Sequence, residues 1–401
     1  MRPIPHAAGL YLGILQFVFT LGWTVYAIYL PRLAASVGIP GSAVIIILML
    51  DQAIFTVTDF AMGLAADKVS RLLGRLGHWV AAITLASCVA FVALPLIAGA
   101  GLGPAPFLAL TIIWAITSSA LRAPPLMLLG RYAARPAIPY LASLAMLGIG
   151  VAGAVSPYLA MTLRDKDPRL PFVIASVTLV LVSLALAKVE RSLAKQAPQK
   201  QEPAPAADRT MPAPIAVFAL AVVIFALGFQ LHFFFNSAPL FGQFTDFIGQ
   251  VMPVFWVGFN VAMFPASLVT KRWGGLPVMG VAGLIGALAI VLMEVSGTLE
   301  ATVTAQLIIG AAWGCILMSA FAAAAAIGAN GAEGTTTGIL FSALALATFA
   351  RMAAIATGVV REPEFASLLP WAPALCWAGA GAALVALSAV YGRTRATKLL
   401  N

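Results

Sequence analysis

Four ionisable side chains lie well inside long apolar segments of this sequence: Asp51, Asp59, Arg122 and Arg351. A charge in the middle of a membrane-spanning helix is costly, so such residues mark either a function or a compensating pair. A carboxylate can bind a proton when its cationic neighbour leaves, and a guanidinium can hold an anion through two parallel hydrogen bonds. This chemistry suits the movement of protons or polar solutes across an apolar barrier.

Asp59 and Arg122 are expected to pair. Asp59 precedes Asp67 by eight residues and Arg122 precedes Arg131 by nine, near the ends of two apolar segments. At about 1.5 Å per helical residue, the two charges lie at similar depth if both helices run in the same direction. Two interpretations remain open: a fixed structural ion pair, or a proton-coupling site that depends on conformation.

Asp51 and Arg351 form a second possible pair, because each lies about ten residues from the outer end of its apolar segment. A bridge between them would act as a gate that holds the outer side closed. Alternatively, Arg351 faces a cavity and binds a substrate carboxylate through its bidentate fork.

These residues belong to a chain in which 62% of residues are hydrophobic and only 9% are charged, against about 25% charged in soluble domains. Apolar runs of membrane-spanning length recur from end to end and predict an all-α membrane protein. The twelve predicted spans are 9–30, 41–65, 78–99, 106–130, 137–162, 170–188, 214–238, 250–270, 275–296, 301–328, 335–360 and 370–392.

A charged, proline-rich stretch divides the spans into two groups of six. We predict an N-terminal six-helix bundle over 1–188, a disordered linker over 189–213 and a pseudo-symmetric C-terminal bundle over 214–401. Lysine and arginine are concentrated in alternate connections, which predicts cytoplasmic termini and linker in a cell (inner or plasma) membrane. This topology signal accounts for the net charge of +9, so no nucleic-acid partner is expected.

The segment after the second span carries a motif: Gly63, three residues, Asp67-Lys68, two residues and Arg71. With twelve spans and a central linker, this motif resembles the major facilitator superfamily, although Ser70 replaces its usual Gly. The resemblance implies two rocking six-helix bundles around a solute site near the midplane. It also implies that Gly63, Asp67, Lys68, Arg71 and Arg75 form a cytoplasmic latch.

The residues before this motif are similar to the cation–sugar symporter branch, the glycoside–pentoside–hexuronide and sucrose carriers. Asp59-Phe60-Ala-Met-Gly63 keeps the Asp and the Gly of its Asp-Pro-x-x-Gly, with Phe60 in place of Pro. Sodium-using members carry a second Asp one turn earlier, where this chain has Phe55. The resemblance therefore implies symport with a proton as the coupling ion.

In the superfamily, spans one, four, seven and ten supply most of the cavity wall. Helical spacing places three sets of side chains on common faces, and aromatic walls with a few amides suit a small organic solute. Packing between helices is the alternative for each set, and His232 is either a proton relay or a hydrogen-bonded helix residue. The candidates are Gln16, Thr20 and Trp23, then Phe229, His232 and Asn236, then Gln306 and Trp313.

Two other functions stay open. The fifth span carries Ala152-Gly153-Ala-Val-Ser156-Pro157, which resembles the antiporter signature of drug/proton exchangers and implies proton-driven efflux of amphipathic compounds. The other is a membrane accessory or lipid-handling protein. No enzyme signature, cofactor motif or metal-ligand cluster is found, the three cysteines are expected to be packing residues, and the chain is expected to act as a monomer in the lipid bilayer.

Overall fold

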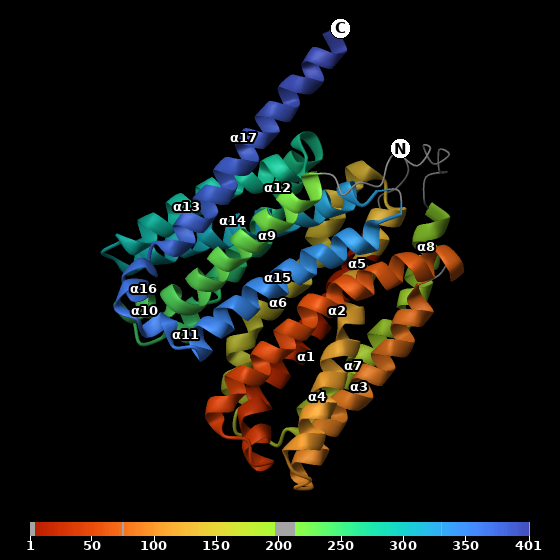
Figure 1. Cartoon of the computed structure of the whole chain (residues 1–401), viewed down its shortest axis with the longest axis vertical. Coiled ribbons are helices and arrows are strands. Elements are labelled where there is room, and N and C mark those ends of the chain that lie inside the picture. The colour runs from red at the N-terminus through yellow and green to blue at the C-terminus, as the bar shows by residue number, and fades with distance from the viewer. Residues whose placement is uncertain (1–4, 74–75, 197–212, 330, 401) are drawn as a thin grey trace.

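The structure, a computed structural model, describes residues 5–73, 76–196, 213–329 and 331–400. All regular elements among these residues are helical, and twelve helical segments are long and apolar enough to cross a membrane. The prediction of an all-α protein with twelve spans is therefore confirmed (Figure 1).

The first six spans pack against one another and form one half of the molecule. They are built from α1 (His6–Ser36), α2 (Val44–Leu73), α3 (Gly77–Gly99), α4 (Pro104–Ser118) with α5 (Ala123–Tyr132), α6 (Ile138–Leu163), and α7 (Arg169–Leu184) with α8 (Leu186–Gln196).

The last six spans form the other half. They are built from α9 (Ala213–Leu231) with α10 (Ser237–Gly242), α11 (Ile248–Val251) with α12 (Val254–Trp273), α13 (Gly275–Glu294), α14 (Leu299–Ile327), α15 (Glu333–Ala356) and α17 (Ala372–Leu400), with the short α16 (Pro363–Leu368) before α17.

The fourth span is broken at Arg122. Pro124 and Pro125 follow, and a proline has no N–H to donate to the carbonyl four residues before it. A short 3₁₀ turn therefore separates α4 from α5, and the buried Gln16 side chain donates to the Leu121 carbonyl at 3.2 Å. The break places Arg122 at a helix junction, where its side chain can leave the helix axis.

The predicted linker begins later than expected, because α8 runs to Gln196. Its buried Glu190 accepts the backbone N–H groups of Leu76 at 2.7 Å and of Gly77 at 2.6 Å. A carboxylate at a helix N-terminus satisfies N–H groups that have no partner within the helix. Glu190 thereby ties α8 to the start of α3, and residues 197–212 lie outside the described residues.

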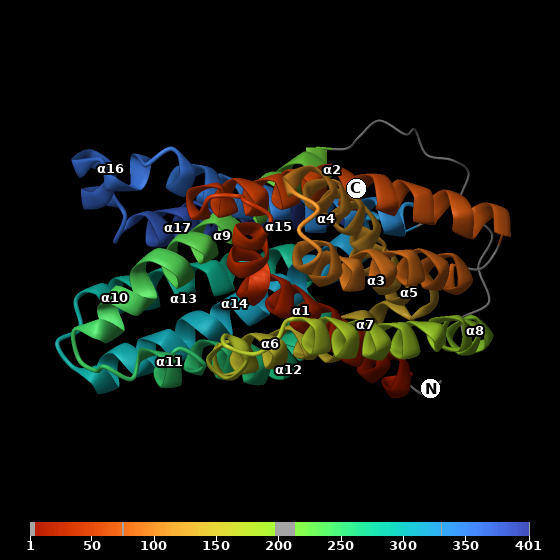
Figure 2. The ribbon, with the colours of Figure 1, turned by 90° about the horizontal axis from the view of Figure 1, so that it is seen from below.

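The two halves meet mainly through α2 against α15 and α6 against α12. We call the end of the molecule that holds His6, Asp67 and Glu333 the closed end, because the halves are in backbone contact there. From this end the helices of the two halves diverge, so that α10, α11 and α16 lie apart from the far ends of α1, α3 and α4 (Figures 1 and 2).

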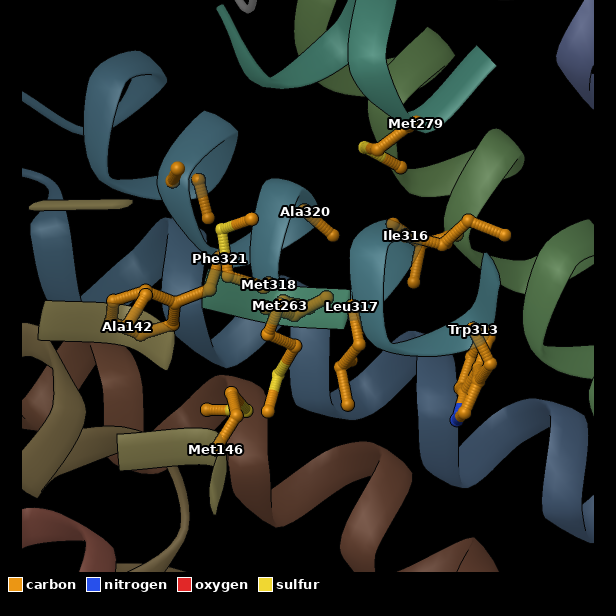
Figure 3. Packing of buried hydrophobic residues seen from close by; sticks show 14 of the residues in the cluster. Ala142, Met146, Met263, Met279, Trp313, Ile316, Leu317, Met318, Ala320 and Phe321 are labelled. Atoms are coloured by element: carbon orange, nitrogen blue, oxygen red, sulfur yellow. The ribbon is translucent and has the colours of Figure 1, made fainter. Parts of the chain in front are cut away.

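One buried apolar core crosses the boundary between the halves at this interface. Ala142 and Met146 of α6 lie near Met263 of α12 and Met318 and Phe321 of α14 (Figure 3). The same core continues into the interior of each half. Burial of these side chains excludes water from the contact between the halves.

Candidate functional site

Asp59 and Arg122 are brought together as predicted. Arg122 Nε lies 3.0 Å from Asp59 Oδ2. The Asp59 side chain is fully buried, whereas 16% of the Arg122 side chain is exposed. The Nε–H does not point at the carboxylate, and neither Asp59 oxygen has a hydrogen-bond partner. The contact is therefore a buried ion pair without the hydrogen bonds that usually stabilise one.

Arg122 also contacts the opposite half. Its guanidinium lies over the Phe55 ring at 4.6 Å and over the Phe341 ring at 5.5 Å. Phe55 belongs to α2, and Phe341 belongs to α15 in the second half. A cation is attracted to the face of an aromatic ring at these distances. The surroundings of Arg122, and through it of Asp59, therefore depend on how the halves are arranged.

Asp59 lies where α2 and α15 cross. A Cβ atom placed on Gly338 would be 2.7 Å from the Asp59 carbonyl oxygen, so the two backbones touch. One turn further along, a Cβ on Gly63 would overlap the Gly334 carbonyl. Small residues allow this close approach of membrane helices.

The closed end is held by Asp67, which lies at the start of α15. Its Oδ1 accepts the Gly334 N–H at 2.7 Å, and its Oδ2 accepts the N–H and the hydroxyl of Thr335 at 2.8 and 2.7 Å. A carboxylate is favoured at a helix N-terminus by the unpaired N–H groups and the helix dipole. Asp67 thus binds the end of a helix in the other half, as expected of a latch residue.

The bases of the predicted latch take less part in these contacts. Lys68 is exposed, and the guanidinium of Arg131 donates to the Ser70 carbonyl at 3.2 Å. The side chain of Arg71 and all of Arg75 lie outside the described residues.

The predicted gate between Asp51 and Arg351 is not formed. Asp51 Oδ2 accepts the Tyr26 hydroxyl at 2.8 Å, and Arg351 Nε donates to Gln230 Oε1 at 2.7 Å. Asp51 packs toward α1, while Arg351 packs toward α9 within its own half. The expected ion pair is wrong for this conformation, because the halves diverge where the bridge would span them (Figure 2).

The candidates in the second half are packed inside it. His232 Nε2 lies 2.8 Å from Gln306 Oε1, and Gln306 Nε2 donates to Ser237 Oγ at 3.2 Å. Asn236 donates to the Leu369 carbonyl at 3.1 Å. A π-helical turn over His232–Asn236 shifts the register, so the spacing from Phe229 no longer defines one face.

Phe229 and Trp313 stack on each other with ring centroids 4.6 Å apart, and both are buried. The prediction that Phe229, Asn236, Gln306 and Trp313 line a cavity is therefore wrong for this conformation. Helix packing, the alternative interpretation, explains their positions.

Thr20 and Trp23 of the first half are half-buried. Trp23 stacks on Trp114 at 5.6 Å, and both line a small pocket with Ser87 and Ser176. Gln16 does not line this pocket, because it is buried against Leu121.

Sequence reasoning missed the side chains that orient the charged groups: Tyr26, Gln230, Phe341 and Thr335. Their types are common in membrane helices, and their partners lie far away along the chain. The one available signal was the spacing of Phe341 and Arg351 on a single face of the eleventh span.

The small residues of the fifth span are explained by packing. A Cβ atom on Gly153 would overlap the Trp256 ring of α12, and one on Gly150 would overlap the Asn260 side chain. The resemblance to an antiporter signature thus has a structural explanation at the contact between α6 and α12.

A twelve-span bundle with a buried ion pair where its halves cross has the architecture of a secondary transporter. Residues 12–351 match the description of the Major Facilitator Superfamily. The chain belongs to this superfamily of transporters, which are not enzymes. No curated protein gives a significant match.

Several solved structures share the fold. A bacterial homologue of the iron transporter ferroportin in the outward-facing state has a TM-score of 0.73 at 12% identity, covering 95% of this chain and 99% of that chain. The human organic anion transporter MFSD10 (TETRAN) has a TM-score of 0.68 at 17% identity, covering 96% and 99%. The Escherichia coli fucose:proton symporter FucP has a TM-score of 0.63 at 14% identity, covering 97% and 98%. At these identities the likeness extends to the fold alone.

Proposed function

We propose that this transporter moves a small organic solute by proton-coupled symport, with Asp59 as the proton-binding group and Arg122 as its conformation-dependent partner. The observation that carries the proposal is the contact of Arg122 with both Asp59 and Phe341. Rocking of the halves moves Phe341 relative to Arg122 and so changes how well Arg122 neutralises Asp59. A carboxylate that loses its cationic partner in an apolar site binds a proton.

Phe55 supports a proton over sodium within this proposal. In the sodium-using members of the cation–sugar branch, to which we provisionally relate the chain by Asp59 and Gly63, an acidic residue stands at this position. Here Phe55 packs against the Arg122 guanidinium at 4.6 Å. An apolar ring and a fixed positive charge supply none of the oxygen ligands that a hard cation needs.

The proposal includes the arrangement of the chain in the membrane. Residues 1–188 and 214–401 act as two rocking bundles, with 189–213 as a cytoplasmic connection. The termini and the closed end face the cytoplasm of a cell (inner or plasma) membrane, and the chain acts as a monomer. On this orientation the structure corresponds to an outward-facing state held by Asp67.

The test begins with a thermal-stabilisation screen of small organic solutes at two pH values, followed by uptake into proteoliposomes. We expect Asp59→Asn to abolish uphill uptake driven by a proton gradient while sparing exchange of solute across the membrane. Uphill uptake by this variant would refute the assignment. Comparison of inverted and right-side-out vesicles separates uptake from proton-driven efflux.

A further inference from the structure

The guanidinium of Arg351 is held in place but is not neutralised. The residue is 9% exposed, and its Nε donates to Gln230 Oε1 at 2.7 Å. Gln230 in turn donates to Thr348 Oγ1 at 3.0 Å, and Thr348 donates to the Leu344 carbonyl at 3.0 Å. These neutral side chains orient the guanidinium without balancing its charge.

No carboxylate among the described residues forms an ion pair with Arg351, since Asp51 bonds Tyr26 and Asp59 pairs with Arg122. Its two Nη atoms have no hydrogen-bond partner in this part of the chain, yet neither is enclosed. A nearly buried cation in a membrane protein is costly without a counter-charge. The free edge of Arg351 therefore suits an anion that arrives from outside the protein.

The contacts of Arg351 leave that edge free. Its guanidinium carbon lies 4.1 Å from the centre of the Phe234 ring, which covers one face of the group. Since Nε is already used by Gln230, the two Nη groups remain for parallel hydrogen bonds to a carboxylate, sulfonate or phosphonate. Phe234 is 48% exposed, so an apolar body attached to the anion can pack beside it.

Arg351 also lies on the side of α15 that faces the first half. Phe341, Leu344, Thr348 and Arg351 follow one another at steps of three or four residues, so they share a face. Phe341 contacts Arg122 of the first half, and ten helical residues place Arg351 about 15 Å further along. This position is on the side where the halves diverge (Figure 2).

We propose that Arg351 binds the anionic group of the solute, and that the substrate class is an organic anion with an apolar or aromatic body. The proposal rests on the transport function proposed above and adds the chemical class of the substrate. Gln230 is a positioning residue, because it acts through Arg351.

The test measures binding to the purified full chain in detergent, without a proton gradient. Benzoate, benzenesulfonate and phenylphosphonate are the probes, and benzamide is the uncharged comparison. We expect at least one anion, but not benzamide, to raise the unfolding temperature. Arg351→Gln should weaken its binding by at least tenfold, whereas Arg361→Gln, a matched change at an exposed arginine, should not.

Arg351→Lys keeps the charge but removes the fork, so it should fold and still bind the anion more weakly than the native chain. Equal binding by native, Arg351→Gln and Arg351→Lys proteins would overturn the proposal, as would a native chain that none of the three anions stabilises. Because no gradient is applied, this result is independent of the Asp59→Asn transport test. Either proposal can therefore fail while the other stands.

Discussion

Replacement of Arg122 by Gln should destabilise the protein by about 3–5 kcal/mol, the usual cost of removing one partner from a buried ion pair. Asp59 is fully buried, and its oxygens have no hydrogen-bond partner. Without Arg122, this carboxylate is either left charged in an apolar site or protonated. The loss of stability should therefore be largest at high pH, where protonation is least favourable.

The double variant Asp59→Asn with Arg122→Gln should recover most of this loss, because it leaves no buried charge. The single Asp59→Asn variant should also be destabilised, since Arg122 then keeps only its ring contacts with Phe55 and Phe341. Denaturant unfolding of the four proteins in one detergent measures the coupling between the two sites. If the two single effects simply add in the double variant, Asp59 and Arg122 do not form a functional pair.

Replacement of Gly63 by Val should open the closed end. A side chain at this position overlaps the Gly334 carbonyl, so α2 and α15 cannot keep their present contact. Overpacking typically costs about 1–3 kcal/mol, which changes the ratio of closed to open molecules by roughly 5- to 150-fold. The contacts of Asp67 with Gly334 and Thr335 should be lost with the same movement.

Spin labels on Leu72 of α2 and Trp273 of α12 can follow this opening, since these side chains are 73% and 64% exposed. The native cysteines Cys88, Cys315 and Cys376 are first replaced. We expect the Gly63→Val protein to show longer distances between the labels. Gly379→Val is the matched control, because a Cβ atom at Gly379 meets no atom within 4 Å. An unchanged distance distribution in Gly63→Val would contradict the description of the closed end.

Features that depend on composition and local spacing could be predicted from the sequence. The length of the apolar runs gave twelve spans, and depth counting along two helices placed Asp59 beside Arg122. Asp67 was expected near the end of another helix because its loop motif is distinctive. Each of these predictions needs a helical rise, a hydrophobic run or a motif, and nothing about tertiary contacts.

The remaining contacts depend on backbone irregularities and on partners distant in the sequence. The π-helical turn at His232 moved Asn236 off the predicted face, and its sequence carries no proline or other recognisable signal. The expected bridge between Asp51 and Arg351 assumed that the halves meet at both ends. Which end is closed is a property of the conformational state, and one sequence encodes more than one such state.

The most direct test of the coupling claim is the pH dependence of the distance between labels at Leu72 and Trp273. Protonation of Asp59 weakens its pair with Arg122, so acidification should move the native protein toward longer distances and an open cytoplasmic end. The Asp59→Asn protein, which cannot titrate at this site, should show one distribution at every pH. A shift in Asp59→Asn as large as that of the native protein would contradict the proposed role of Asp59.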